Sequence, residues 1–184
     1  TDIAVSSDSK KIIKLTKKYK NVIKIQRPNR LATSSASKIE AIRHAVLFCE
    51  NKNHSKYDLI FDLDATSVLR EVEDIKKALK ILVKKKADNL FSVNYSRRNP
   101  YFNIVEKRNG KIQVVKKNKE NITRRQDAPL TYDMNASMYI YKRKVLFSNN
   151  CLFRKKTEIY IMDFERSIDI DTKFDLLMIK NLIK

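Results

Sequence analysis

Short apolar runs alternate with stretches of helical spacing through the first half of the chain. Apolar runs of this length predict strands, at residues 2–6, 22–25, 57–64 and 88–94. Apolar residues three and four apart predict helices between them, at 8–18, 35–50 and 72–85. This βαβ order with short connections is typical of a three-layer α/β fold, with a mostly parallel sheet and helices on both faces. In such sheets ligands bind beyond the carboxyl ends of the strands.

The pattern changes after residue 96. Asn109-Gly110 lies between two segments of strand character, 103–106 and 111–115, and Asn-Gly is the strongest short-range hairpin signal. The polar stretch 116–131 has little periodicity, so residues 97–132 are expected to form a hairpin-containing excursion. Two further strands and a last helix are predicted at 138–141, 157–162 and 173–183.

Length and charge narrow the function classes. The 184 residues, 42% of them hydrophobic, suffice for one domain, 1–184, with a buried core. No apolar run is long enough for a membrane helix, and we expect a cytoplasmic protein without a membrane partner. The formal net charge of +19 suits nucleic acid, anionic lipid or phosphorylated small molecules. It is equally compatible with a lysine-rich background. The aromatic residues fall in apolar strand positions, which argues against nucleic-acid binding.

Glycine and cysteine usage exclude several kinds of site. One glycine in the whole chain leaves no possibility of a glycine-rich phosphate loop within these residues. The two cysteines, Cys49 and Cys151, lie far apart in sequence outside any CxxC motif, so we expect buried thiols. With only two histidines, a structural zinc site is not expected.

An acidic pair near the carboxyl end is the sharpest chemical signal. Asp169 and Asp171 are two residues apart, and in an extended segment such residues point to the same side. Two carboxylates on one side suit Mg²⁺, which takes a few carboxylates together with phosphate and water. Alternatively, Asp171 caps the following helix and Asp169 is merely exposed.

Three polar segments offer further candidate contacts. Asp64, Thr66, Ser67 and Arg70 follow an apolar strand and could hold a polar ligand, or they could simply form the turn. Arg124-Arg125 could clamp a carboxylate or phosphate, or could be solvated. Residues 27–37 place Arg27 and several hydroxyls before a helix N-terminus, which favours anions.

Together these segments resemble one family, the acylneuraminate (CMP-sialic-acid synthetase type) cytidylyltransferases. The matching residues cover nearly the whole chain, and Arg-Ser-Ile-Asp-Ile-Asp-Thr at 166–172 is the most specific match. The other matching segments are 5–8, 27–28, 31–33, 36–37, 65–70, 99–100, 125–127 with Pro129, and 135–139. The resemblance implies a Rossmann-like fold of the nucleotide-diphospho-sugar transferase type. It also implies transfer of CMP from CTP to a nine-carbon sugar acid with release of pyrophosphate.

The resemblance also implies roles for individual residues. Asp169 and Asp171 match the family's Mg²⁺-binding aspartates, and Arg125 is placed with them as a catalytic residue. Arg27, Ala32 and Ser37 fall in the segment that contacts cytidine. The sugar-acid contacts are assigned to Asp64, Thr66, Ser67, Arg70, Gln126, Asn135 and Tyr139. A homodimer is expected, with the excursion 97–132 packing on the partner subunit.

The chain departs from the family pattern in ways that affect the expected activity. The family's opening strand and glycine-rich triphosphate loop have no counterpart before Thr1, so the fold is expected to be N-terminally incomplete and turnover weak or absent. Asp64 lies where many family members have Gln, and Ala65 and Val68 lie where many have Pro. Ala136 replaces a usual Gly. This altered loop suggests legionaminic or pseudaminic acid as substrate, with KDO as another possible sugar acid. The alternatives are a non-catalytic partner subunit and a basic nucleic-acid-binding protein.

Overall fold

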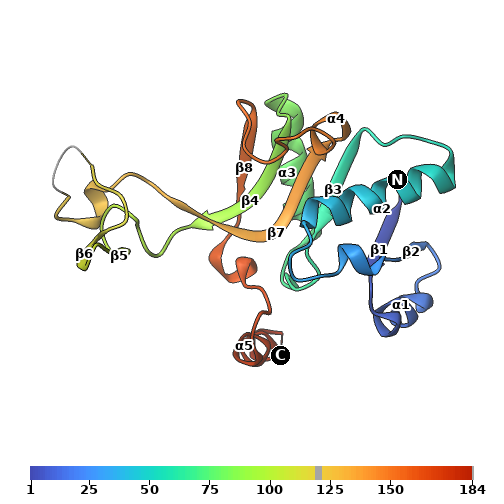
Figure 1. Ribbon diagram of the computed structural model, residues 1–184, viewed down its shortest axis with the longest axis horizontal. Coiled ribbons are helices and arrows are strands. Elements are labelled where there is room, and N and C mark those ends of the chain that lie inside the picture. Colours follow the sequence, from blue (N-terminus) through green and yellow to red (C-terminus); the bar gives the residue numbers. More distant parts are fainter. Residues whose placement is uncertain (119–121, 184) are drawn as a thin grey trace. The chain divides into compact units, whose positions relative to one another are not determined.

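The computed structural model describes residues 1–118 and 122–183 (Figure 1). The strands are β1 (Ile3–Ser7), β2 (Val22–Gln26), β3 (Leu59–Leu63), β4 (Asn89–Tyr95), β5 (Val105–Arg108), β6 (Lys111–Val114), β7 (Tyr132–Lys142) and β8 (Thr157–Ile161). The helices are α1 (Lys10–Leu15), α2 (Lys38–Asn53), α3 (Val72–Lys84), α4 (Arg143–Leu146) and α5 (Lys173–Leu182). Short 3₁₀ turns complete the described elements: η1 (Thr16–Lys18), η2 (Asn29–Leu31), η3 (Arg125–Asp127) and η4 (Phe164–Ser167).

The strands form three sheets. β1 and β2 pair in parallel, and a four-stranded sheet has the order β3-β7-β4-β8. Backbone bonds join Arg143 to Asp58 at one end of the β3–β7 pairing and Asp64 to Ser137 at the other. Since one number rises as the other falls, β7 runs antiparallel to β3. The α/β class predicted from the pattern is confirmed, with an antiparallel strand within the four-stranded sheet.

The chain divides into two compact units. Unit 1 comprises Thr1–Asp62 and Ile140–Thr157, and unit 2 comprises Leu63–Tyr139 and Glu158–Lys184. Unit 1 buries Ile25, Val46, Tyr141 and Leu146, and both Cys49 and Cys151 are buried free thiols there, as predicted. Unit 2 buries Leu82, Leu90, Val93, Met138 and Met162. Each unit therefore has an apolar core of its own.

Two helices begin at the caps that the sequence indicates. The Ser9 hydroxyl accepts the Ile12 N–H at 3.4 Å before α1. Thr172 and Asp175 form a capping box at α5. Where the apolar spacing of α1 suggests a buried face, however, Ile12 and Leu15 are 47% and 62% exposed, because this six-residue helix packs mainly on the small β1–β2 sheet and the adjoining η1.

The excursion contains the predicted hairpin. β5 and β6 pair antiparallel, with Arg108 opposite Lys111. Asn109 and Gly110, at φ 51° and 77°, make the two-residue turn between them, as a type I′ turn requires. Residues 119–121 of the excursion lie outside the described residues. The dimerisation role of residues 97–132 stays a prediction.

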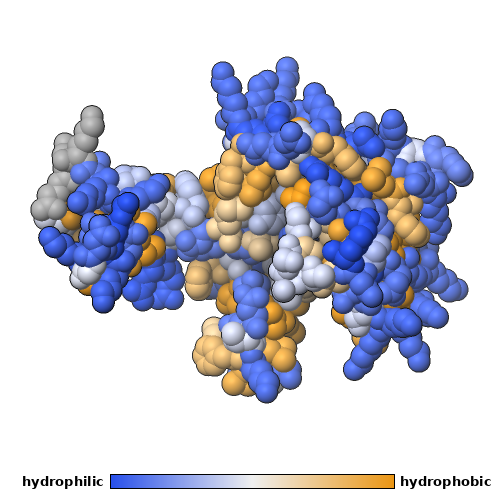
Figure 2. Space-filling view, viewed as in Figure 1, coloured by the Kyte–Doolittle hydropathy of each residue, from blue (hydrophilic) through white to orange (hydrophobic). Residues whose placement is uncertain are grey.

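The last helix, α5, carries apolar side chains on most of its surface. Phe174, Leu177 and Leu182 are more than half exposed, and only Ile179 among its described residues is buried. In Figure 2 this helix is mostly orange. Among the described residues, no helix combines the length and hydrophobicity that a bilayer crossing requires.

Candidate functional site

The loop after β3, residues 64–70, is ordered by its own side chains. The Asp64 carboxylate accepts the Thr66 N–H at 3.2 Å and the Thr66 hydroxyl at 2.9 Å, which closes an Asx-type turn. Ser67 is only 3% exposed, and its hydroxyl lies 2.7 Å from that of Ser137 in β7. The predicted sugar-acid residues Asp64, Thr66 and Ser67 are therefore brought together at the carboxyl end of β3.

Arg70 fastens this loop to β7. Its guanidinium donates to the backbone carbonyl of Ser137, to the Ser137 hydroxyl at 3.2 Å, and to the carbonyl of Asp64 at 3.3 Å. One carbonyl acceptor lies at the start of the loop and the other lies in β7, so these charge-assisted bonds connect the loop to the strand. Arg70 therefore holds the predicted sugar-acid loop against β7.

Asn135 and Ser137 stand on either side of a left-handed residue in β7. Ala136 has φ 53°, a conformation that costs a residue with a Cβ about 1–2 kcal/mol. The buried Asn135 amide accepts the Ser92 hydroxyl at 2.7 Å and donates to the Ser167 hydroxyl at 3.0 Å. Asn135, predicted as a sugar contact, thus links β4, β7 and η4.

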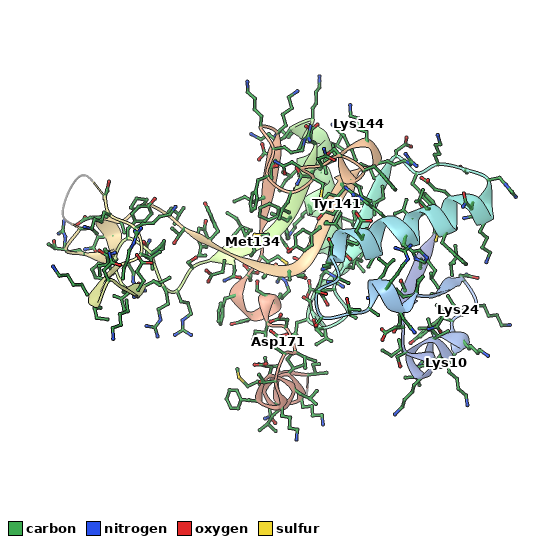
Figure 3. All side chains as sticks on the ribbon, viewed as in Figure 1. Lys10, Lys24, Met134, Tyr141, Lys144 and Asp171 are labelled. Atoms are coloured by element: carbon green, nitrogen blue, oxygen red, sulfur yellow. The ribbon has the colours of Figure 1, made fainter. Side chains whose placement is uncertain are left out.

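The acidic pair follows η4, on the connection that enters α5, where Figure 3 labels Asp171. This connection is assigned to no strand, although Ile168 directly after η4 has extended backbone. It is fastened near Asp169 on both sides, because Ser167 bonds Asn135 and the Ile170 N–H donates to the Thr66 carbonyl at 3.3 Å. The cap of α5 is Thr172 rather than Asp171.

Like charges gather around Asp169. Burial raises the pKa of the half-buried Asp169 carboxyl, and the charges of Asp171, Asp175 and Asp64 raise it further. Asp175 is occupied in the α5 capping box, whereas Asp171 is exposed. Hard carboxylate oxygens under mutual repulsion fit a divalent cation. No set of three ligating side chains is gathered within the described residues, so such a cation needs further oxygens from a ligand or water.

A buried ion pair that the sequence reasoning missed lies beside this connection. Asp74, 1% exposed at the start of α3, accepts the Tyr160 hydroxyl at 2.8 Å and an Arg166 Nη2 proton at 3.2 Å. Burial alone would raise the pKa of Asp74, but hydrogen bonds from Glu71 and Tyr160 and the charge of Arg166 outweigh it and hold the pKa below its ordinary value. No local pattern signals a pair separated by 92 residues.

The remaining sugar-acid candidates in unit 2 lie on other elements. Arg125 and Gln126 are exposed in η3 of the excursion. Tyr139 is half-buried in β7, with its ring centroid 6.1 Å from that of Phe91. The substrate roles of these three residues stay predictions.

The predicted cytidine contacts form a separate group in unit 1. Arg27 follows β2, and its guanidinium donates to the Ser6 carbonyl at 2.7 Å, next to the end of β1. Ala32 ends η2, and Ser37 precedes the first turn of α2. The side chain of Ser37 caps no N–H of that turn among the described residues. The N-terminus of α2 can therefore attract an anion.

A cavity of 570 Å³ lies elsewhere in unit 1, at the C-terminal end of α2. It includes none of the predicted site residues. Its lining residues are Leu47, Glu50, Asn51, His54, Ser55, Lys56 and Arg143.

Similar proteins of known activity cover almost the whole chain, although no protein-family model matches it. The chain is 41% identical to post-translational flagellin modification protein B of Campylobacter coli, over 99% of this chain and 77% of that protein. It is 40% identical to CMP-N,N'-diacetyllegionaminic acid synthase of Campylobacter jejuni, over 98% and 76%. It is 25% identical to a pseudaminic acid cytidylyltransferase of Campylobacter jejuni, over 100% and 78%.

A solved structure shares the fold. The crystal structure of 4-diphosphocytidyl-2C-methyl-D-erythritol synthase superimposes with a TM-score of 0.62, covering 100% of this chain and 80% of that chain at 10% identity.

Proposed function

We propose that this chain, which belongs to the acylneuraminate-type cytidylyltransferase family, transfers CMP from CTP to a nonulosonic sugar acid and releases pyrophosphate. The connection between η4 and α5, residues 168–172, carries Asp169 and Asp171 and is called the acidic connection below. The observation that carries the proposal is that this connection is bonded to the loop 64–70. The bond between Ile170 and Thr66, together with the influence of Asp64 on Asp169, brings the two predicted binding segments together. A sugar acid on one segment and a nucleotide phosphate on the other would then be neighbours.

Mg²⁺ is the cation that fits this donor set. Asp169 and Asp171 would hold it, with the nucleotide phosphates and water supplying the other oxygens. When bound, Mg²⁺ neutralises charge on the phosphates and orients them. The repulsion that raises the pKa of Asp169 would be relieved by any cation at this position.

The proposed reaction is one displacement at phosphorus. The oxygen of the sugar's anomeric hydroxyl forms a bond to the α-phosphorus of CTP, the bond from that phosphorus to the pyrophosphate oxygen breaks, and the hydroxyl proton leaves. Such transfers depend on positioning and on charge stabilisation. The loop 64–70, held by Arg70 and Ser67, supplies positioning, and the exposed Arg125 could add positive charge.

Within the sugar acids, the comparisons favour an acid of the legionaminic type. Identity to the legionaminic acid synthase is 40%, against 25% for the pseudaminic acid enzyme. Asp64, which stands where the family pattern has Gln, occupies its carboxylate with Thr66. We propose that this carboxylate, in place of a neutral amide, changes which sugar acid the loop accepts.

Pyrophosphate release from CTP tests the proposal directly. The 184-residue chain is incubated with CTP and Mg²⁺ and with legionaminic, pseudaminic or N-acetylneuraminic acid in turn. We expect release with the legionaminic acid above the other two, and a decrease of about 10²-fold or more in Asp169→Asn. CTP binding by calorimetry without pyrophosphate release from any of the three acids would contradict the proposed transfer while leaving a nucleotide site in place. No CTP binding at all would contradict the proposal and favour the non-catalytic partner subunit.

A further inference from the structure

We propose that Arg166 is a positioning residue that sets Asp169 and Asp171 for a divalent cation, and that the buried Asp74 holds Arg166 in place for this purpose. The inference rests on the proposed function and extends it to residues that touch neither nucleotide nor sugar acid. It begins from how the acidic connection is held.

The segment from η4 to Ile170 is fixed at three points, which lie on three different elements. Arg166 binds Asp74 at the start of α3, Ser167 binds Asn135 in β7, and the Ile170 N–H binds the Thr66 carbonyl. Asp169 lies between the second point and the third. Its backbone is therefore held on both sides.

Of these three points, the one at Arg166 involves the strongest groups. The Asp74 side chain is 2% exposed and that of Arg166 is 27% exposed, and charge-assisted bonds are roughly twice as strong as neutral ones. Asp74 is fixed from two further directions, by the Tyr160 hydroxyl of β8 and by the Glu71 N–H. Arg166 also reaches Asp163 at 2.9 Å, which closes η4 on itself. The guanidinium thus ties η4 to a rigid helix end.

The same carboxylate also determines where the loop 64–70 ends. Through the Glu71 N–H, Asp74 caps α3 directly after Arg70. The buried Asp74 side chain therefore bonds Arg166, which precedes the acidic pair, and the Glu71 N–H, which directly follows the loop 64–70. Contact with both segments is what a positioning role for Asp74 and Arg166 requires.

Mn²⁺ binding in the presence of CTP tests the inference without requiring turnover. Free Mn²⁺ is measured by electron paramagnetic resonance for the full chain and its variants, and the melting temperature of each is recorded. We expect Arg166→Gln to raise the Mn²⁺ Kd about 10- to 100-fold, the range found when outer partners of metal ligands are removed. Arg166→Lys, which keeps the charge without the planar fork, should recover part of this loss.

The control and the second variant separate positioning from folding. Glu73→Gln alters an exposed group one residue from Asp74 and should leave the Kd unchanged. If Arg166→Gln alone does not fold, the double variant Asp74→Asn/Arg166→Gln removes both charges, and it should fold and still bind Mn²⁺ weakly. A wild-type Kd in a folded Arg166 variant, with Asp169→Asn still weakened, would overturn the positioning role alone. No binding sensitive to Asp169→Asn in the wild type would overturn the cation site of the proposed function and the inference with it.

Discussion

Two Arg–Asp pairs in unit 2 show how differently its regions are held. Asp74 and Arg166 meet in a buried setting, with a tyrosine and a helix cap converging on the carboxylate. Arg124 and Asp127 meet in the excursion at 2.8 Å, with side chains 67% and 40% exposed and only three residues apart. The first pair joins distant elements, whereas the second closes one local turn. The acidic connection is thus held by contacts with other elements of the chain, while Arg125 and Gln126 stand on a surface element.

The largest expected difference concerns stability. Asp74→Ala leaves the buried Tyr160 hydroxyl without its acceptor, while Arg166 keeps its contact with Asp163, and should lower the free energy of unfolding by about 1–3 kcal/mol. Arg124→Ala, the matched change in the exposed pair, should cost about 0–1 kcal/mol. Urea unfolding of both variants measures these losses. Equal losses would contradict the distinction between the two regions.

Acid should weaken the buried pair as well. The pKa of Asp74 is held below the ordinary value of 3.8, so its carboxylate stabilises the fold fully above that value and progressively less as the pH falls below it. The free energy of unfolding, followed by urea unfolding from about pH 6 to pH 3, should therefore fall less steeply at the acid end in Asp74→Asn than in the wild type. Parallel curves for the two proteins would show that Asp74 does not contribute to the acid sensitivity.

The smallest expected effects involve two residues with positive φ, Ala136 in β7 and Gly110 in the excursion. Ala136→Gly should raise the free energy of unfolding by about 0.5–1 kcal/mol, because relief of the strained φ exceeds the entropy that glycine loses on folding. Gly110→Ala should lower it by about 1 kcal/mol for the opposite reason, since no atom lies within 4 Å of the added Cβ. Urea unfolding measures both changes. A loss of stability in Ala136→Gly would mean that Ala136 is not strained.

Local signals predicted most of the fold. Apolar runs located β1, β2, β3, β4 and β8 to within about two residues, and Asn109-Gly110 located the hairpin. The pattern found only residues 138–141 of β7, because the first half of this eleven-residue strand carries polar side chains and the left-handed Ala136. Of these residues, Asn135 and Ser137 are buried and bonded by partners on other elements, which no short window of sequence can reveal.

The candidate site was predicted by resemblance rather than by spacing. The spacing argument considered Asp169 and Asp171 in an extended segment; the structure has the 3₁₀ turn η4, then extended backbone at Ile168, and assigns no strand to residues 168–172. Burial and then the charge of Asp171 nevertheless raise the pKa of Asp169, and bonds to Asn135 and Thr66 hold the backbone before and after Asp169. Asp74 was overlooked because a capping residue at N3 looks ordinary in sequence. Its carboxylate also accepts hydrogen bonds from Tyr160 and Arg166, which lie 86 and 92 residues further along the chain.

The backbone bond from Ile170 to Thr66 has a consequence for the order of events during a catalytic cycle. A ligand that settles the loop 64–70 also restricts the peptide that carries Asp169, and a ligand held by Asp169 restricts the loop in return. By thermodynamic linkage, each must then alter the affinity for the other by the same factor. Whichever substrate enters first would leave the second with less ordering entropy to lose.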